Sequence, residues 1–449
     1  MSAVREIRLH GHQSVAVDAL RAGFSKSRRQ ILVAPTAFGK TECAAYIILK
    51  ALDKGSRVWF VVDRVSLIDQ TLDRFALYGI DAGVIQASHF MTAPEKPVQV
   101  VSAQTLARRS IAQHPDLLII DEAHCEYAAV LNLVERAGRA KVIGLTATPF
   151  TAGMADHWDA VVNGATVNFL LGDNPEGKRF LSPLKVKACV EPDFKGVKKR
   201  KGEYDDEEAG ERGIKIIGNV VQTWVEQTRQ HFGGPVKTLV FSPSVKHGEE
   251  FCRAMAVAGF NFQQISYLDA NEDERRAKIT EFRKPDSAIH GLVSCAVLTK
   301  GFDQPDVLCG ISCRPYRKSF SSHIQEMGRV MRISPETGKT FGLWLCHSGN
   351  AVTFATETAA LFEYGVESLS DASKKDSATR DKPERAKAEM FCSECGMQMQ
   401  PRNDRCIECG WERPKRSEIQ IVQGELIDLD MRASAAFKPR AGLHAACLK

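Results

Sequence analysis

No stretch of the 449-residue sequence approaches the ~20 consecutive apolar residues that a helix needs to cross a bilayer. The opening segment, MSAVREIRLHGHQ, lacks the apolar core of a secretory signal peptide. A large excess of charge of one sign is also missing, because the net charge is only +5. These absences predict a cytoplasmic protein with no membrane partner. The mild positive charge permits an anionic partner without requiring one.

Apolar residues make up 44% of the chain and charged residues 26%, which is ordinary for a globular protein. The length corresponds to about three domains of ~150 residues. Most of the 13 cysteines are scattered singly through apolar segments, where we expect buried, reduced thiols. Four others form a separate motif late in the chain.

Continuous β-rich apolar runs alternate with helical patterns through most of the chain, which predicts buried parallel strands in α/β layers. In the first half, the expected strands are 30–34, 57–63, 98–102, 116–121 and 141–146. In the second half, they are 237–242, 261–266, 290–296, 306–312 and 340–346. The sequence therefore predicts two tandem parallel-sheet domains. The predicted boundaries are 1–165 for the first domain, 166–212 for a connector with a surface loop, 213–355 for the second domain, 356–390 for a linker, 391–413 for a cysteine module and 414–449 for a tail.

The first expected strand runs into the loop APTAFGKT (34–41), which opens a helix. Backbone N–H groups of such a loop and the helix N-terminus cradle phosphates. We expect Lys40 to reach the β- and γ-phosphates and the Thr41 hydroxyl to ligate Mg²⁺. The loop departs from the Gly-first form, because Ala34 and Ala37 stand where many such loops have Gly. The expected nucleotide contacts here are Pro35, Thr36, Ala37, Phe38, Gly39, Lys40 and Thr41.

The fourth expected strand ends in the acidic motif DEAH (121–124). Acidic residues at the carboxyl end of a buried parallel strand face the crevice where α/β sheets bind ligands. We expect Asp121 to hold Mg²⁺ and Glu122 to orient the attacking water. Two adjacent carboxylates would be costly without a cation. Together with the phosphate loop, they predict an ATP site rather than two solvated strand ends.

The order of these motifs resembles that of the superfamily-two helicases of the DEAH-box type, over about residues 8–350. RLHGHQ (8–13) is similar to the family's adenine-reading segment, with Gln13 at the matching glutamine. The other matching segments are VVDRVSLIDQT (61–71), VSAQTL (101–106), GLTATPF (144–150), TLVFSPSVKHGEEF (238–251), AVLTKGFDQPDV (296–307) and HIQEMGRVMR (323–332). With LWLCHSGN (343–350) and the cysteine module, the chain most resembles bacterial RadD-like DNA-repair helicases and their phage relatives.

The resemblance implies two RecA-like domains that share one ATP site, followed by a small zinc ribbon. The implied catalytic residues are Lys40, Asp121, Glu122, Gln325, Arg329 and Arg332. The two arginines would reach across the cleft to the γ-phosphate as arginine fingers. Asp303 and Gly301 from the second domain, and Thr146 and Thr148 from the first, would link the nucleotide to the nucleic acid. The implied nucleic-acid contacts are Arg64, Gln104, Thr105, Ser244 and Thr299.

Cys392, Cys395, Cys406 and Cys409 form two C-x-x-C-G knuckles within 391–414. Four paired cysteines in a cytoplasmic chain are typical of a structural, tetrahedral Zn²⁺ site. The segment is too small for an apolar core, so the metal would supply most of its folding free energy. A redox dithiol and plain reduced cysteines are the alternatives.

The leading prediction is an ATP-dependent DNA helicase or translocase that moves on, and unwinds or remodels, DNA in repair, recombination or replication. The choice of DNA rests on the resemblance. The alternatives are an RNA helicase, a duplex translocase that does not separate strands, and a nucleotide-binding scaffold with weak catalysis. The resemblance also implies a bacterial or phage-infected host cytoplasm, and it leaves room for single-strand-binding or repair proteins as partners.

Overall fold

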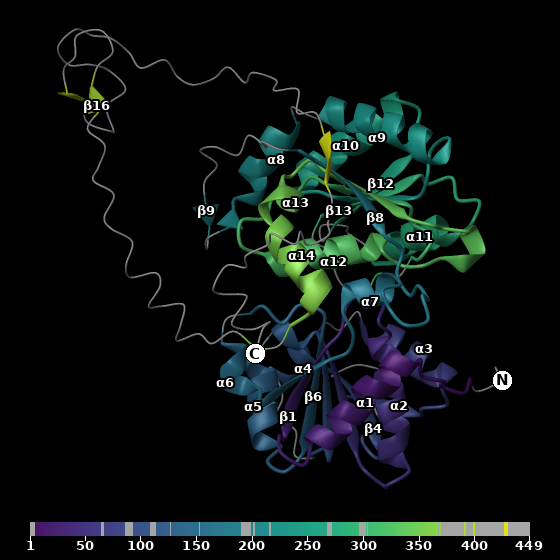
Figure 1. Cartoon of the computed structure of the whole chain (residues 1–449), viewed down its shortest axis with the longest axis vertical. Coiled ribbons are helices and arrows are strands. Elements are labelled where there is room, and N and C mark those ends of the chain that lie inside the picture. The colour runs from purple at the N-terminus through teal and green to yellow at the C-terminus, as the bar shows by residue number, and fades with distance from the viewer. Residues whose placement is uncertain are drawn as a thin grey trace.

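The computed structural model describes residues 5–369 with short gaps, and also 390–391, 398–399 and 426–429. The gaps are 64–66, 86–92, 108–113, 126, 152, 190–198, 201–202, 215–216, 267–271, 296–301, 303 and 367. Within these residues, two α/β domains are stacked one above the other (Figure 1). The prediction of two tandem parallel-sheet domains is confirmed.

The first domain is built on a parallel sheet in the order β3-β4-β2-β5-β6-β1-β7. Its strands are β1 (Arg29–Val33), β2 (Val58–Val62), β3 (Ala82–Ile85), β4 (Val98–Ser102), β5 (Leu117–Asp121), β6 (Lys141–Thr146) and β7 (Ala160–Asn163). Its helices are α1 (Gly11–Gly23), α2 (Lys40–Leu52), α3 (Ile68–Leu77), α4 (Ala103–Leu106), α5 (Ala128–Arg136), α6 (Met154–His157) and α7 (Val167–Leu171). The central strands β2 and β4 are buried along their whole length, which explains why their apolar runs do not alternate.

The second domain has the sheet order β12-β13-β11-β14-β15-β8-β18. Its strands are β8 (Leu184–Cys189), β11 (Thr238–Phe241), β12 (Phe262–Ser266), β13 (Gly291–Cys295), β14 (Cys309–Ser312), β15 (Gly342–Cys346) and β18 (Leu426–Leu429). Its helices are α8 (Asp206–Ile214), α9 (Ile217–Phe232), α10 (Val245–Val257), α11 (Glu272–Arg283), α12 (Phe320–Val330), α13 (Asn350–Thr353) and α14 (Ala355–Tyr364). All pairs are parallel except β18, which runs antiparallel to β8.

The segment 166–212, expected to be a connector with a surface loop, contains regular structure. Besides α7, β8 and part of α8, it holds a hairpin of β9 (Lys199–Arg200) and β10 (Glu203–Tyr204). Strand β8 belongs to the second sheet, although LKVKAC reads as polar because two lysines interrupt it. Those lysines suit a strand near the sheet edge, where one face meets solvent.

The regions after the second domain also differ from expectation. The linker 356–390 includes most of α14, which packs against α7 of the first domain. Asn163, at the end of β7, exchanges hydrogen bonds with the backbone of Val366. The four module cysteines lie outside the described residues, so the structure does not test the zinc ribbon; β16 (Met390–Phe391) and β17 (Gln398–Met399) form a small antiparallel pair there.

Among the described helices, none combines the length and the apolar character that a bilayer-spanning helix requires.

Candidate active site

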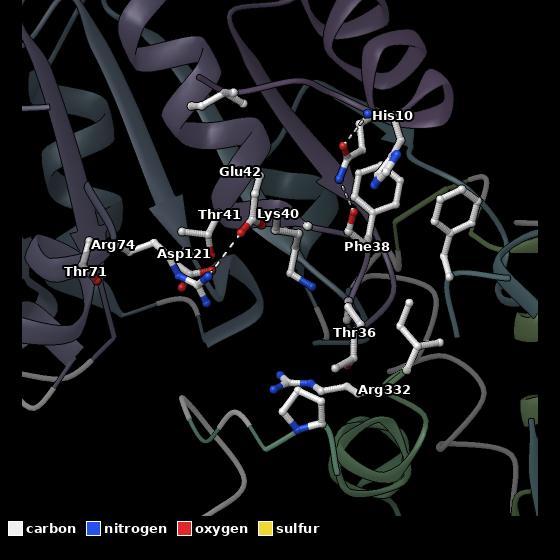
Figure 2. A pocket seen from close by; sticks show the side chains of 18 of the residues that line it. His10, Thr36, Phe38, Lys40, Thr41, Glu42, Thr71, Arg74, Asp121 and Arg332 are labelled. Carbon is white, nitrogen blue, oxygen red and sulfur yellow. Dashed lines mark hydrogen bonds and ion pairs between the residues drawn. The ribbon is translucent and has the colours of Figure 1, made fainter. Parts of the chain in front are cut away.

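A cleft of about 780 Å³ lies between the two domains. It is lined from the first domain by the phosphate loop and the carboxyl end of β5, and from the second domain by α12 and the residues that follow it. Figure 2 shows Lys40, Thr41 and Asp121 on one side of this cleft and Arg332 on the other. The expected site residues that line it are Gln13, Thr36, Ala37, Phe38, Gly39, Lys40, Thr41, Asp121, Glu122, Gln325, Arg329 and Arg332.

The phosphate loop takes a conformation that one glycine permits. Gly39 has φ +90° and is the N-cap of α2, and a Cβ built on it would lie 2.2 Å from Gln13 Nε2. Both facts favour glycine at this position. Ala37 also has a left-handed φ of 65°, which an L residue adopts only at a cost. The Lys40 ammonium donates to Ala34 O at 3.0 Å and to Pro35 O at 3.3 Å, within the loop itself.

The acidic end of β5 faces Lys40 across the cleft floor. Burial raises the pKa of Asp121 to about 7, and the charge of Glu122 adds to this rise while that of Lys40 opposes it. Burial likewise lowers the pKa of Lys40, against the attraction of both carboxylates. The two half-buried carboxylates and the Thr41 hydroxyl are oxygen donors of the kind that Mg²⁺ prefers. The donor set therefore fits a magnesium–nucleotide complex.

The arginines of the second domain reach this cleft from the end of α12. Arg329 lies in the last turn of α12, and its Nη1 donates to Phe302 O at 2.7 Å. Arg332 lies beyond the helix end at Val330, where its backbone pairs with Leu181. The two residues therefore do not share one helical face, but both line the cleft.

Helix α12 of the second domain closely approaches the phosphate loop of the first at Gly328. A Cβ built on Gly328 would lie 2.6 Å from Thr36 Oγ1 and 2.8 Å from Thr36 Cβ. A side chain here would force the helix and the loop apart. Glycine at this position thus permits the contact that brings Arg329 to the cleft.

A chain of polar contacts links the two domains below the nucleotide cleft. His124 Nδ1 lies 2.9 Å from Thr146 Oγ1 and 3.3 Å from Glu122 Oε2. Gln325 Nε2, from α12, lies 3.4 Å from both His124 Nε2 and Thr148 Oγ1. Glu122 is therefore connected to Gln325 of the second domain through the His124 side chain.

The end of the cleft nearest α1 is aromatic. Gln13 is buried; its Oε1 accepts from His10 N at 2.8 Å and its Nε2 donates to Phe38 O at 2.7 Å. The His12 ring packs against Phe180 and Phe38 at centroid distances of 4.5 and 5.1 Å. Burial lowers the pKa of His12 to about 4, so its imidazole is neutral at pH 7. The neutral His12 ring and the hydrogen-bonded Gln13 amide together suit the planar base of a nucleotide.

The residues expected to contact nucleic acid differ in their exposure and in their contacts. Gln104 is exposed on α4. Thr105 is buried, and its Oγ1 lies 2.8 Å from Ser102 Oγ. Ser244 accepts from His247 N at 3.2 Å as the N-cap of α10. Arg64, Thr299, Gly301 and Asp303 lie outside the described residues.

Sequence reasoning missed several residues that line the cleft. Glu42 Oε1 lies 3.4 Å from Arg74 Nη1 (Figure 2). It also lies 3.4 Å from Tyr78 Oη. Phe180 comes from the segment expected to be a connector. The position of Glu42 next to the Gly-Lys-Thr signature was a usable signal, whereas nothing in the sequence marked Arg74, Tyr78 or Phe180.

Two family descriptions match the chain, one in each domain. "Type III restriction enzyme, res subunit" matches residues 6–151, and "Helicase conserved C-terminal domain" matches residues 220–334. A 51.5 kDa protein of a Lactococcus phage is 28% identical over 310 residues, covering 67% of this chain and 62% of that protein. A mitochondrial ATP-dependent helicase designated irc3, from Schizosaccharomyces pombe, is 27% identical over 331 residues, covering 68% and 52%. The chain thus spans less than two thirds of either relative.

Solved structures share the fold. A fragment assigned to the HsdR subunit of a type I restriction enzyme from Vibrio vulnificus has a TM-score of 0.61 at 19% identity, covering 77% of this chain and 66% of that one. The ATP-dependent Type ISP restriction-modification enzyme LlaBIII bound to DNA has a TM-score of 0.56 at 18% identity, covering 75% and 27%. In both domains the chain is therefore similar to helicases of superfamily two, it has a phage protein among its relatives, and the solved structures share its fold.

Proposed function

We propose that this chain is a nucleic-acid-dependent ATPase that moves on DNA and unwinds or remodels it. The observation that carries the proposal is the composite cleft: Lys40, Asp121 and Glu122 come from one domain, and Arg329 and Arg332 from the other. A site completed by both domains couples nucleotide occupancy to the angle between them. That coupling is what a motor requires.

In this proposal, Lys40 neutralises charge on the transferred phosphoryl group, and Glu122 orients and polarises the attacking water. Thr41 and Asp121 would hold Mg²⁺, which would offset the negative charge of the phosphates. Arg329 and Arg332 stabilise charge that develops in the transition state. The polar chain from Glu122 through His124 to Gln325 would report the state of the nucleotide to the second domain.

DNA is proposed over RNA because LlaBIII, which shares the fold, was solved bound to DNA, and because a relative from Aeropyrum pernix is an ATP-dependent DNA helicase, Hel308. That relative is 28% identical over 158 residues, which cover 31% of this chain. A role in repair, recombination or replication, and action in the cytoplasm, are proposed from the resemblance of the sequence motifs to RadD-like DNA-repair helicases and their phage relatives.

Steady-state ATP hydrolysis tests the proposal, measured without nucleic acid and with single-stranded DNA, duplex DNA or RNA. We expect stimulation by DNA that is lost in Lys40→Ala. Stimulation by RNA alone would make the chain an RNA helicase. Folded protein that hydrolyses no ATP under any condition would be a nucleotide-binding scaffold. Displacement of a strand from a tailed duplex separates a helicase from a duplex translocase.

We also propose that Cys392, Cys395, Cys406 and Cys409 bind one structural Zn²⁺. The support is their spacing, two C-x-x-C-G knuckles in a segment too short for an apolar core. We expect one zinc per chain by elemental analysis, falling in Cys406→Ser. Absence of zinc after metal-supplemented expression would favour reduced thiols or a redox dithiol.

A further inference from the structure

The second-domain wall of the nucleotide cleft comes from two separate segments. The loop before β14 contributes Pro305, and the end of α12 contributes Arg329 and Arg332. One hydrogen bond already joins them, because Arg329 Nη1 donates to Phe302 O at 2.7 Å. The positions of the two arginines at the nucleotide therefore depend on how these segments are held together.

Lys339, in the connection between α12 and β15, bridges the two segments. Its ammonium donates to the carbonyl oxygens of Pro305 at 3.2 Å and Val307 at 2.5 Å, both in the loop before β14. It also donates to Val330 O, in α12, at 2.7 Å. A lysine ammonium has three N–H donors, so all of them can be used on these backbone carbonyls.

The contact with α12 falls at the end of that helix. Val330 is its last residue. The final carbonyls of a helix have no partner within it and form the negative end of its dipole, so a cation stabilises them. Val330 directly follows Arg329, and Arg332 comes two residues later. Holding this carbonyl thus fixes the backbone that carries both arginines.

Lys339 is half-buried, and a buried cation is costly unless it is hydrogen-bonded. Burial lowers the pKa of Lys339 to about 7; the attraction of Asp306 opposes this fall, and the charge of Arg332 adds to it. The Asp306 carboxylate is itself paired with Lys237 Nζ at 2.7 Å. The three carbonyl oxygens are therefore the hydrogen-bond partners that keep Lys339 in place.

We propose that Lys339 is a positioning residue for ATP hydrolysis, which holds the loop before β14 against the end of α12 and so sets the place of Arg329 and Arg332 at the nucleotide. This inference rests on the proposed function. Lys339 is not among the residues that line the cleft. It therefore acts through the two arginines and not by contact with the nucleotide.

Lys339→Met removes the ammonium and keeps the length of the side chain. At about pH 6, below the pKa of Lys339, we expect kcat for DNA-stimulated ATP hydrolysis to fall about tenfold or more, since small misplacements of catalytic groups can cost 10²-fold. The Kd of a fluorescent nucleotide should stay as in wild type.

The matched control is Lys237→Met. Lys237 is also half-buried, and it donates to Lys284 O at 2.8 Å and to the Asp306 carboxylate at 2.7 Å, not to α12. Both variants should lower the melting temperature, but only Lys339→Met should lower kcat. An equal loss of kcat in the two variants, or a normal kcat in Lys339→Met, would overturn the proposal while the motor stands.

A double-mutant cycle tests whether Lys339 acts through the arginines. In an Arg329→Ala background, Lys339→Met should lower kcat much less than it does in wild type, because one of the groups that it positions is already gone. Losses that multiply independently would overturn the proposal. If Lys339→Met does not fold, Lys339→Gln, which keeps an amide donor, takes its place in the same cycle.

Hydrogen exchange gives a readout that needs no turnover. The peptide that covers residues 329–333 should exchange faster in Lys339→Met than in wild type, and should be unchanged in Lys237→Met. Unchanged exchange in Lys339→Met would show that Lys339 does not hold the end of α12. A wild-type chain that hydrolyses no ATP under any condition would instead overturn the proposed function, and hydrogen exchange would still decide whether Lys339 joins the two segments.

Discussion

Ala37 and Glu122 are the non-glycine residues with positive φ in the part of the chain that the structure describes, and both line the nucleotide cleft. Left-handed backbone costs an L residue roughly 1–2 kcal/mol. Such strain persists where the surrounding structure holds it, and it collects at functional sites. Ala37 stands where many phosphate loops have glycine, and its φ of 65° is one that glycine would adopt without this cost.

Ala37→Gly should relieve this strain. We expect its free energy of unfolding to lie within about 0.5 kcal/mol of wild type, or above it, because the relief offsets the added freedom of the unfolded chain. The control is Ala256→Gly, an exposed position in α10, where the same change should cost about 1 kcal/mol. Urea unfolding measures both. Equal losses in the two variants would show that the loop carries no strain.

Glu326, in α12, is buried and accepts a hydrogen bond from the Tyr316 hydroxyl at 2.6 Å. Burial raises the pKa of Glu326 to about 8, from an ordinary 4.5. A carboxyl whose pKa is raised by folding favours the fold at low pH, and this contribution is lost as pH rises from about 4.5 to about 8.

Glu326→Gln removes that titration and keeps the shape of the side chain. The melting temperature of the variant should therefore gain on wild type between pH 5 and pH 9. Thermal unfolding at several pH values measures the difference between the two proteins. A difference that stays constant with pH would mean that folding does not shift the pKa of Glu326.

At the scale of elements, strands with continuous apolar sequence were predictable, whereas the two edge strands of the first sheet were not. The expected strand 98–102 coincides with β4, and 57–63 exceeds β2 by one residue at each end. Strand β3 has the sequence AGVI and β7 is only half-buried, so neither carries the apolar run of a central strand. Strand β8 was not predicted because its two lysines alternate with its buried residues, so its sequence has no continuous apolar run.

The contact of Gly328 with the phosphate loop predicts an effect on turnover rather than on folding. In Gly328→Ala the new methyl group meets Thr36, so the domains close less fully, and we expect kcat for ATP to fall about tenfold or more, as small misplacements of catalytic groups can cost 10²-fold. The control is Gly218→Ala in α9, where an added Cβ meets nothing within 4 Å. Steady-state kinetics and melting temperatures of both variants distinguish the effects. A Gly328→Ala protein with normal kcat would show that the helix can withdraw without harm to the site.

At the scale of the whole molecule, the order of motifs predicted which residues of the first domain meet which residues of the second. It did not predict how the chain ties the domains together. The packing of α14 on α7, the Asn163–Val366 hydrogen bonds and the pairing of β18 with β8 join segments far apart in sequence. Such contacts depend on how distant segments pack in the folded chain, and no local sequence pattern predicts that packing.

Because both domains contribute residues to the site, a mutation in the second domain should impair ATP hydrolysis without impairing nucleotide binding. Arg329→Ala removes a group of the second domain, so we expect kcat to fall about 10³-fold, as for arginine fingers, while nucleotide affinity changes little. Fluorescent-nucleotide binding and stimulated ATP hydrolysis measure the two properties. Arg253→Ala, exposed on α10, is the control. A variant that loses affinity and turnover equally would show that Arg329 acts in binding.

The pairing of β18 with β8 joins residues 426–429 to the second sheet, far along the sequence from α14. This connection consists of a four-residue strand and the ion pair of Asp428 with Lys187 at 2.9 Å. A single proteolytic cut between α14 and β18 should therefore leave two pieces that migrate together under native conditions and separate in denaturant.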